Sequence, residues 1–179
     1  MSDISKDKQP LRVIFMRHGK YSATEVKGFD MDGPLTSDGV AQVERTAVQI
    51  RGNFLDLGKV KVFCSPRART QHSAEVLVEV LELDAADNEV ADALDDKAST
   101  DEVINCAPIF MQKSLAELPE DVRTVILISH KPVISVYTYH LALKMFDGGY
   151  AETMVIDTDR EALKAGGVDY EERSLIGPV

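Results

Sequence analysis

Short apolar runs, rich in β-branched residues and bounded by polar or glycine-containing segments, recur along the chain. Each run is shorter than an ordinary helix, so the pattern predicts strands. The runs show no clean alternation of polar and apolar residues, and we therefore expect both faces of their sheet to be covered. The predicted strands span residues 11–16, 59–64, 123–129 and 152–159.

Between these runs, apolar residues return at the three- and four-residue spacing that is typical of amphipathic helices. Thr36 has the side chain of an N-cap, and Pro66 and Pro132 suit a first helical turn. The acidic stretch 83–100 is weakly patterned and is interpreted as a surface loop, and the last twenty residues are expected to be irregular. The predicted helices span residues 37–58, 66–81, 100–118 and 132–145.

Strands that alternate with helices indicate an α/β fold with a mostly parallel central sheet and helices on both faces. The chain has 179 residues, of which 44% are hydrophobic, and this is enough for one compact core. We expect a single domain over residues 11–179, preceded by a flexible tail at residues 1–10.

The net charge of −10 argues against broad binding to nucleic acids or anionic membranes, since both need a basic face. No segment approaches the ~20 apolar residues of a membrane span. The polar start of the chain does not resemble a signal peptide, and the two cysteines, Cys64 and Cys106, suit a reducing compartment. These features predict a cytoplasmic protein with no nucleic-acid or membrane partner.

Histidines and arginines follow three of the predicted strands directly. Arg17 and His18 end the first strand, Arg67 and Arg69 come soon after the second, and His130 follows the third. In parallel sheets, sites form beyond the carboxyl ends of the strands, so we expect these side chains to meet at one edge. Such a group of histidine and arginine side chains predicts a pocket that binds an anion.

These residue types suit phosphoryl transfer, in which catalysis consists mostly of positioning and charge stabilisation. A neutral imidazole can attack phosphorus, and arginine forks match phosphate oxygens. A second, protonated imidazole can donate to the developing charge, and the helix near Pro66 adds backbone N–H groups. Gly19 would let the chain turn tightly beside the phosphate.

Four ordered motifs resemble the histidine phosphatase superfamily: MRHG, PLTSDG, CSPRARTQHSA and ILISHKPVI, which start at residues 16, 34, 64 and 126. The resemblance implies a three-layer, phosphoglycerate mutase-like sandwich. It also implies His18 as the nucleophile, with Arg17, Arg69 and His130 as phosphate ligands. Arg67 stands where the family usually has an apolar residue. It either lines the mouth of the pocket or is a solvated surface charge at the start of a helix.

Larger members of the superfamily use an acidic residue to protonate the leaving group, and Asp96 is the nearest match, with Asp92 and Asp95 as rivals. The alternative is that all three belong to a solvated loop. The small phosphohistidine phosphatases lack this acid, and the chain resembles them in length. A histidine leaving group departs readily and needs less help than an alkoxide.

Two other phosphatase signatures do not fit. Asp30, Asp32 and Gly33 match an aspartate-nucleophile loop, but the residues before them are polar, so we interpret them as a turn. Cys64 lacks the arginine six residues later that a cysteine phosphatase requires. His72 and His140 are expected to pack or to lie at the surface, and no clustered spacing predicts a metal.

The sequence therefore predicts a phosphatase that needs no metal or cofactor and acts through a phosphohistidine intermediate, with a phosphohistidine-bearing protein as the preferred substrate. The alternatives are a phosphomonoesterase acting on a small phosphorylated metabolite, and a phosphate-binding protein without turnover. Lys20, Tyr21, Ser22 and the segment 147–155 are further candidates for the pocket entrance, which the sequence alone leaves open.

Overall fold

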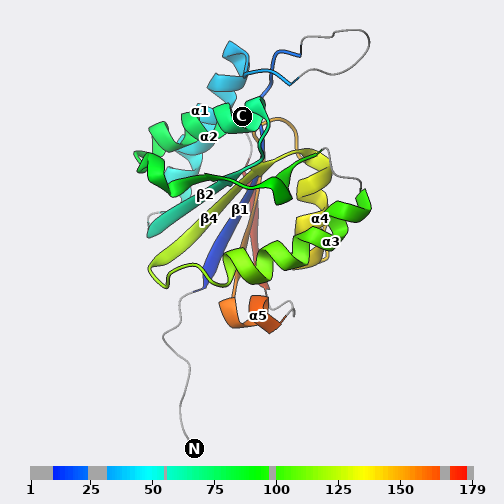
Figure 1. Ribbon diagram of the computed structural model, residues 1–179. Coiled ribbons are helices and arrows are strands. Elements are labelled where there is room, and N and C mark those ends of the chain that lie inside the picture. Colours follow the sequence, from blue (N-terminus) through cyan, green and yellow to red (C-terminus); the bar gives the residue numbers. More distant parts are fainter. Residues whose placement is uncertain (1–9, 24–31, 55, 97–99, 166–169, 177–179) are drawn as a thin grey trace, which may run out of the picture.

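The computed structural model describes residues 10–23, 32–54, 56–96, 100–165 and 170–176 (Figure 1). Of the tail predicted for residues 1–10, only Pro10 lies within these ranges, and Asp30 lies outside them. No helix in the described part of the chain is long and apolar enough to cross a membrane.

Within the described residues, the centre of the protein is one sheet of six strands. They are β1 (Leu11–Arg17), β2 (Lys59–Cys64), β3 (Asn88–Val90), β4 (Val122–Ser129), β5 (Thr153–Thr158) and β6 (Tyr170–Ile176). Their order is β3-β2-β4-β1-β5-β6. The first four strands in this order run parallel, whereas β5 is antiparallel to β1 and β6 is antiparallel to β5. The expected mostly parallel sheet is confirmed.

Helices cover both faces of the sheet and make it the middle of three layers (Figure 1). They are α1 (Ser37–Asn53), α2 (Ala68–Leu81), α3 (Thr100–Phe110) and α4 (Lys131–Ala142), followed by the short α5 (Arg160–Ala165). Residues of β1 alternate between the layers. Val13 and Phe15 pack with α3 and α4, while Ile14 and Met16 pack with α1 and α2, and all four are fully buried. Burial on both faces explains the unbroken apolar runs.

The helices begin close to where the sequence predicts. Thr36 caps α1, because its Oγ1 accepts the N–H of Gly39 at 3.1 Å. Pro132 lies in the first turn of α4, and α2 starts at Ala68, with Arg67 as its N-cap. The helix predicted at 100–118 is α3, extended by a π-helical turn at Met111–Leu115.

Two predictions about irregular segments were wrong. The expected surface loop 83–100 contains the edge strand β3 and two 3-10 turns, and the C-terminal segment contains α5 and β6. β3 and β6 are the two edge strands, and both carry charged residues in their sequences. An edge strand is held by backbone pairing on one side and does not need an apolar run.

The register of three strands fixes the edge where the site lies. Arg17 of β1 pairs with Ser129 of β4, and Cys64 of β2 pairs with Ile128 of β4. The carboxyl ends of β1, β4 and β2 therefore stop at nearly the same level, with β4 in the middle. Residues that follow these strands emerge side by side.

Candidate active site

His18 follows β1 and is held in place by main-chain hydrogen bonds. Its N–H donates to the carbonyl of Ser129 at 3.1 Å, and its own carbonyl accepts from Ala151 at 3.2 Å. The ring is buried, and its Nδ1 lies 2.9 Å from the carbonyl oxygen of Gly19. Since a carbonyl only accepts, Nδ1 carries the proton and Nε2 keeps its lone pair. This is the tautomer that a nucleophile needs.

The surroundings of His18 keep its imidazole neutral. Burial lowers the pKa of His18 to about 4, and the positive charges of Arg69 and Arg17 contribute to the same shift. The hydrogen bond to Gly19 acts in the opposite direction and is outweighed. A neutral ring at physiological pH can donate its electron pair to phosphorus.

Arg17, the last residue of β1, lies beside this ring. Its guanidinium carbon lies 4.1 Å from the centre of the Tyr150 ring, and Nη1 donates to the carbonyl of Gly148 at 3.4 Å. The buried Nε has no hydrogen-bond partner among the described residues. Arg17 therefore retains donor capacity next to His18.

Arg69 lies in the first turn of α2 and is almost fully buried. Two carboxylates bind its terminal nitrogens, Asp32 at 3.0 Å from Nη1 and Asp96 at 2.6 Å from Nη2. The guanidinium carbon of Arg69 lies over the ring of Tyr21, 4.7 Å from the ring centre. Asp32 also accepts the backbone N–H of Ala68 at 2.6 Å, so the same carboxylate orients Arg69 and binds the start of α2.

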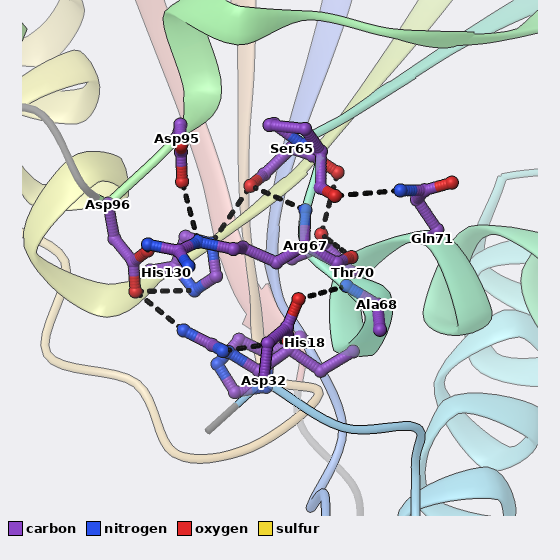
Figure 2. A network of polar contacts seen from close by, with 12 residues as sticks. His18, Asp32, Ser65, Arg67, Ala68, Thr70, Gln71, Asp95, Asp96 and His130 are labelled. Atoms are coloured by element: carbon purple, nitrogen blue, oxygen red, sulfur yellow. Dashed lines mark hydrogen bonds and ion pairs between the residues drawn. The ribbon is translucent and has the colours of Figure 1, made fainter. Parts of the chain in front are cut away.

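His130 follows β4, and its ring centre lies 5.1 Å from that of His18. Its Nε2 lies 3.0 Å from the hydroxyl oxygen of Ser65, which accepts the N–H of Arg67 at 3.4 Å. The hydroxyl hydrogen is thus available to Nε2, which leaves the ring proton on Nδ1, 3.3 Å from Asp96. Figure 2 shows Ser65 and Asp96 on either side of this ring.

The expected protonated second imidazole is not the state of the free protein. Burial lowers the pKa of His130 far below its ordinary value, and Arg69, His18 and Arg67 add to the effect. The nearby carboxylate of Asp96 does not reverse this shift. His130 offers a neutral N–H donor instead of a charge.

The acidic turn after β3 was interpreted mainly as a solvated loop, and this was wrong for two of its carboxylates. Asp95 binds Nε of Arg67 at 2.7 Å, and Asp96 binds Nη2 of Arg67 at 2.7 Å (Figure 2). Asp92, by contrast, is exposed. The ion pairs join residues about thirty positions apart, so no local pattern reveals them. Of the three candidate acids, Asp96 binds Arg69 and lies 3.3 Å from Nδ1 of His130.

The charges at this edge of the sheet are nearly balanced, because Arg17, Arg67 and Arg69 face Asp32, Asp95 and Asp96. Within the described part of the chain, Asp95, Asp96 and His130 form one group with the spacing of metal ligands. Both carboxylates are already paired with arginines, and further cations nearby disfavour a metal ion. The donor set suits an anion better.

Unpartnered buried donors support an anion site. Nε of Arg17, Nε of Arg69 and Nδ1 of His130 have no aligned hydrogen-bond acceptor in the described structure. Buried N–H groups without acceptors are rare in proteins and often mark a place for a ligand. All three belong to residues that surround His18, and the oxygens of a phosphoryl group would satisfy them.

Other predicted residues have different tasks. The amide of Gly19 donates to Ser73 at 3.1 Å, and an added Cβ would lie 2.6 Å from the carbonyl oxygen of Gly39, so this glycine permits close packing against α1. His72 accepts the N–H of Leu35 at 3.1 Å and is a packing residue, as expected. Lys20 forms an exposed ion pair with Asp38.

Three functional candidates escaped the sequence argument: Asp32, Ser65 and Tyr150. Asp32 was assigned to a turn, although its carboxylate binds Arg69. Ser65 was quoted only as part of a motif. Tyr150 belongs to the segment 147–155, whose reach toward the pocket was left open. For Ser65, its position directly after a predicted strand was the feature of the sequence that could have indicated a place in the site.

Comparison with known proteins finds one family model that matches part of the chain. The sequence matches the histidine phosphatase superfamily (branch 1) over residues 13–98, a range that includes His18, Arg69 and Asp96. No curated protein sequence matches the chain. The family match confirms the resemblance that the four motifs predicted, and it supports a phosphatase.

Solved structures share the fold. The protein histidine phosphatase SixA in complex with tungstate is 20% identical, with a TM-score of 0.69 over 94% of this chain and 97% of that chain. SixA from Nakamurella multipartitia is 22% identical, with a TM-score of 0.66 over 94% and 96%. A mycobacterial glucosyl-3-phosphoglycerate phosphatase is 17% identical, with a TM-score of 0.66 over 91% and 97%. The phosphoglycerate mutase-like fold is thereby confirmed.

We expect the His18 imidazole to titrate with a midpoint near pH 4 in the folded protein, because burial and two arginines disfavour its charged form. NMR spectra of the imidazole Cε1–H across acidic and neutral pH measure this, and a His18→Ala variant assigns the signal. In urea the midpoint should return to about 6.5. Between these values the unfolded chain binds the extra proton, so the free energy of unfolding falls as the pH is lowered through this window. A folded-state midpoint near the ordinary value would contradict the buried, neutral nucleophile.

Proposed function

We propose that this protein, which has the sequence signature and the fold of the histidine phosphatase superfamily, is a phosphatase. It forms a covalent intermediate on His18 and needs no metal. The observation that carries the proposal is the neutral His18 ring, protonated on Nδ1, beside buried donors of Arg17, Arg69 and His130. Nucleophile and anion clamp lie together at one edge of the sheet.

In the proposed reaction, Nε2 of His18 attacks phosphorus in line and forms an N–P bond. The bond from phosphorus to the leaving atom breaks, and that atom keeps the electron pair and accepts a proton. Water then attacks phospho-His18, and the N–P electrons return to Nε2. Arg17, Arg69 and His130 donate to the three equatorial oxygens, where charge accumulates.

A phosphoryl group has to compete with carboxylates of the protein for Arg69. Asp32 and Asp96 already bind both terminal nitrogens of this arginine. We propose that phosphate displaces Asp96, since this carboxylate keeps a second cation, Arg67, as partner. A protonated Asp96 would be the donor to the leaving atom, ahead of its rivals Asp95 and Asp92.

Two observations bear on the substrate. The chain covers 97% of a protein histidine phosphatase, SixA, and the chain length is that of a small member. It also covers 97% of a glucosyl-3-phosphoglycerate phosphatase, which acts on a metabolite. We favour a phosphohistidine-bearing protein because an imidazole departs from phosphorus readily. A small phosphorylated metabolite is the second candidate, and the position of Asp96 favours it, because an alkoxide needs an acid.

The proposal extends to the cellular compartment, the domain organisation and the partners of the protein. We place it in the cytosol as a single domain, because Cys64 and Cys106 are both unpaired in the described structure and suit reducing conditions. The acidic net charge of −10 favours neither nucleic acid nor an anionic membrane as a partner. A phosphate-binding protein without turnover is the remaining alternative.

We expect phosphate release in the presence of EDTA, because the site supplies its positive charge from arginines. A phosphohistidine protein and sugar phosphates should be compared side by side, with released phosphate as the readout. His18→Ala should abolish release, whereas His140→Ala, a change on α4 outside the site, should have no effect. Faster release from phosphohistidine supports the favoured substrate, and faster release from sugar phosphates supports the second.

Three results would count against this function. Release that requires magnesium would return the chemistry to an aspartate nucleophile. Saturable phosphate binding without any release would identify a binding protein. Release that survives in the His18→Ala variant would remove the proposed nucleophile.

An Asp96→Asn variant tests the competition for Arg69. We expect orthophosphate to inhibit this variant on the order of tenfold more strongly, since one opposing charge worth about 1.4 kcal/mol disappears. Turnover of sugar phosphates should fall by about 10²-fold or more if Asp96 is the acid, with a smaller loss for phosphohistidine. Asp92→Asn, an exposed neighbour, is the matched control. Unchanged or weaker inhibition by orthophosphate would show that Asp96 does not occupy the phosphate position.

A further inference from the structure

Two tyrosines flank the nucleophile, and each faces one arginine of the anion site. The Tyr150 ring lies 4.1 Å from the guanidinium carbon of Arg17, and the Tyr21 ring lies 4.7 Å from that of Arg69. The ring centres of Tyr150 and Tyr21 are 5.6 and 5.3 Å from that of His18. The tyrosines come from different loops, one before β5 and one after β1.

A guanidinium group held over an aromatic ring by a cation–π contact can still donate N–H groups to oxygen acceptors, because the ring takes up no oxygen acceptor of its own. This geometry fixes the direction of the donors without consuming them. It matters most for Arg17, whose hydrogen bond to Gly148 is long, at 3.4 Å, and whose buried Nε has no partner in the described structure. Without a support, a long arginine side chain samples many rotamers.

Tyr150 is itself held by the end of β1. The main-chain carbonyl of Glu152 accepts the N–H of Arg17 at 3.1 Å, and the N–H of Ala151 donates to the carbonyl of His18 at 3.2 Å. The carbonyl of Ala151 accepts the hydroxyl of Thr46 from α1 at 2.8 Å. The residues on the C-terminal side of Tyr150 are therefore bound to the backbone of both Arg17 and His18. The position of Tyr150 is therefore coupled to the end of β1, the strand that carries Arg17.

We propose that Tyr150 is a positioning residue that holds the Arg17 guanidinium with its donors directed at the phosphoryl group. Tyr21 does the same for Arg69 but contributes less, because Asp32 and Asp96 already fix that arginine. Nothing in the family match or in the resemblance assigns these rings a task. The inference rests on the proposed function, since it refines how that site binds phosphate.

Four variants separate the ring from its hydroxyl and from its bulk. Tyr150→Phe keeps the ring, Tyr150→Leu keeps apolar bulk without a ring, and Tyr21→Leu makes the same change at the second tyrosine. Tyr139→Leu is the matched control, since this tyrosine is 52% exposed on α4 and lies outside the four motifs. The readouts are the inhibition constant of orthophosphate, and kcat and KM for metal-free phosphate release. Thermal unfolding of each variant checks that it is folded.

We expect Tyr150→Leu to weaken inhibition by orthophosphate about 3- to 30-fold, the range of a partly desolvated cation–π contact. The loss should appear in both kcat and KM, because Arg17 binds the phosphoryl group in the ground state and binds it more strongly in the transition state, where charge accumulates on the equatorial oxygens. Tyr150→Phe should stay within about twofold of the parent protein, since it retains the ring that makes the contact. Tyr21→Leu should show a smaller loss than Tyr150→Leu.

Equal phosphate affinity in the parent protein and in a folded Tyr150→Leu variant would overturn the inference. So would a Tyr150→Phe variant as impaired as Tyr150→Leu, because the hydroxyl would then be the important group. If Tyr150→Leu is not folded, the Tyr150→Phe result decides alone. A parent protein that neither binds orthophosphate nor releases it would refute the proposed function instead, so the two failures are distinguishable.

Discussion

The parallel pairing of β4 with β1 on one side and β2 on the other is the constraint on which the site depends. The pairs Arg17–Ser129 and Cys64–Ile128 place three strand ends at one level. Main-chain hydrogen bonds then continue the alignment beyond the strands, since the N–H groups of His18 and Ser65 donate to Ser129 and Ile128 at 3.1 Å each. A shift of one strand by a single residue would separate His18 from Arg69 and His130. The apolar layers on both faces of the sheet hold this register.

Charge balance is the second principle of the site. The chain carries a net charge of −10, yet three arginines gather at one edge of the sheet. Carboxylates of Asp32, Asp95 and Asp96 neutralise two of them, Arg67 and Arg69, and fix the orientation of both side chains at the same time. Burial keeps both histidines uncharged, so that one can act as a nucleophile. The site is thus organised before any phosphate binds, and a substrate replaces contacts that the protein already makes.

The sequence predicted the parts of the protein that local pattern controls. Apolar runs located β1, β2, β4 and β5, and the rule that sites follow parallel strands brought His18, Arg69 and His130 together. It did not predict β3 and β6, because charged edge strands lack an apolar run. Nor did it predict the contacts of Asp32 and Asp96 with Arg69, since their partners lie about thirty positions away and depend on tertiary packing. The charge state of His130 also followed from burial, which a motif does not reveal.

The central claim is that His18 carries the phosphoryl group during turnover. The most direct measurement is to mix the protein with substrate in EDTA, to quench at alkaline pH, where phosphohistidine survives, and to analyse the proteolytic fragments by mass spectrometry. Our account predicts one phosphoryl group on the fragment that contains His18, with the modified atom assigned to the imidazole. A phosphoryl group on an aspartate, or sustained turnover without any phosphorylated His18, would contradict it.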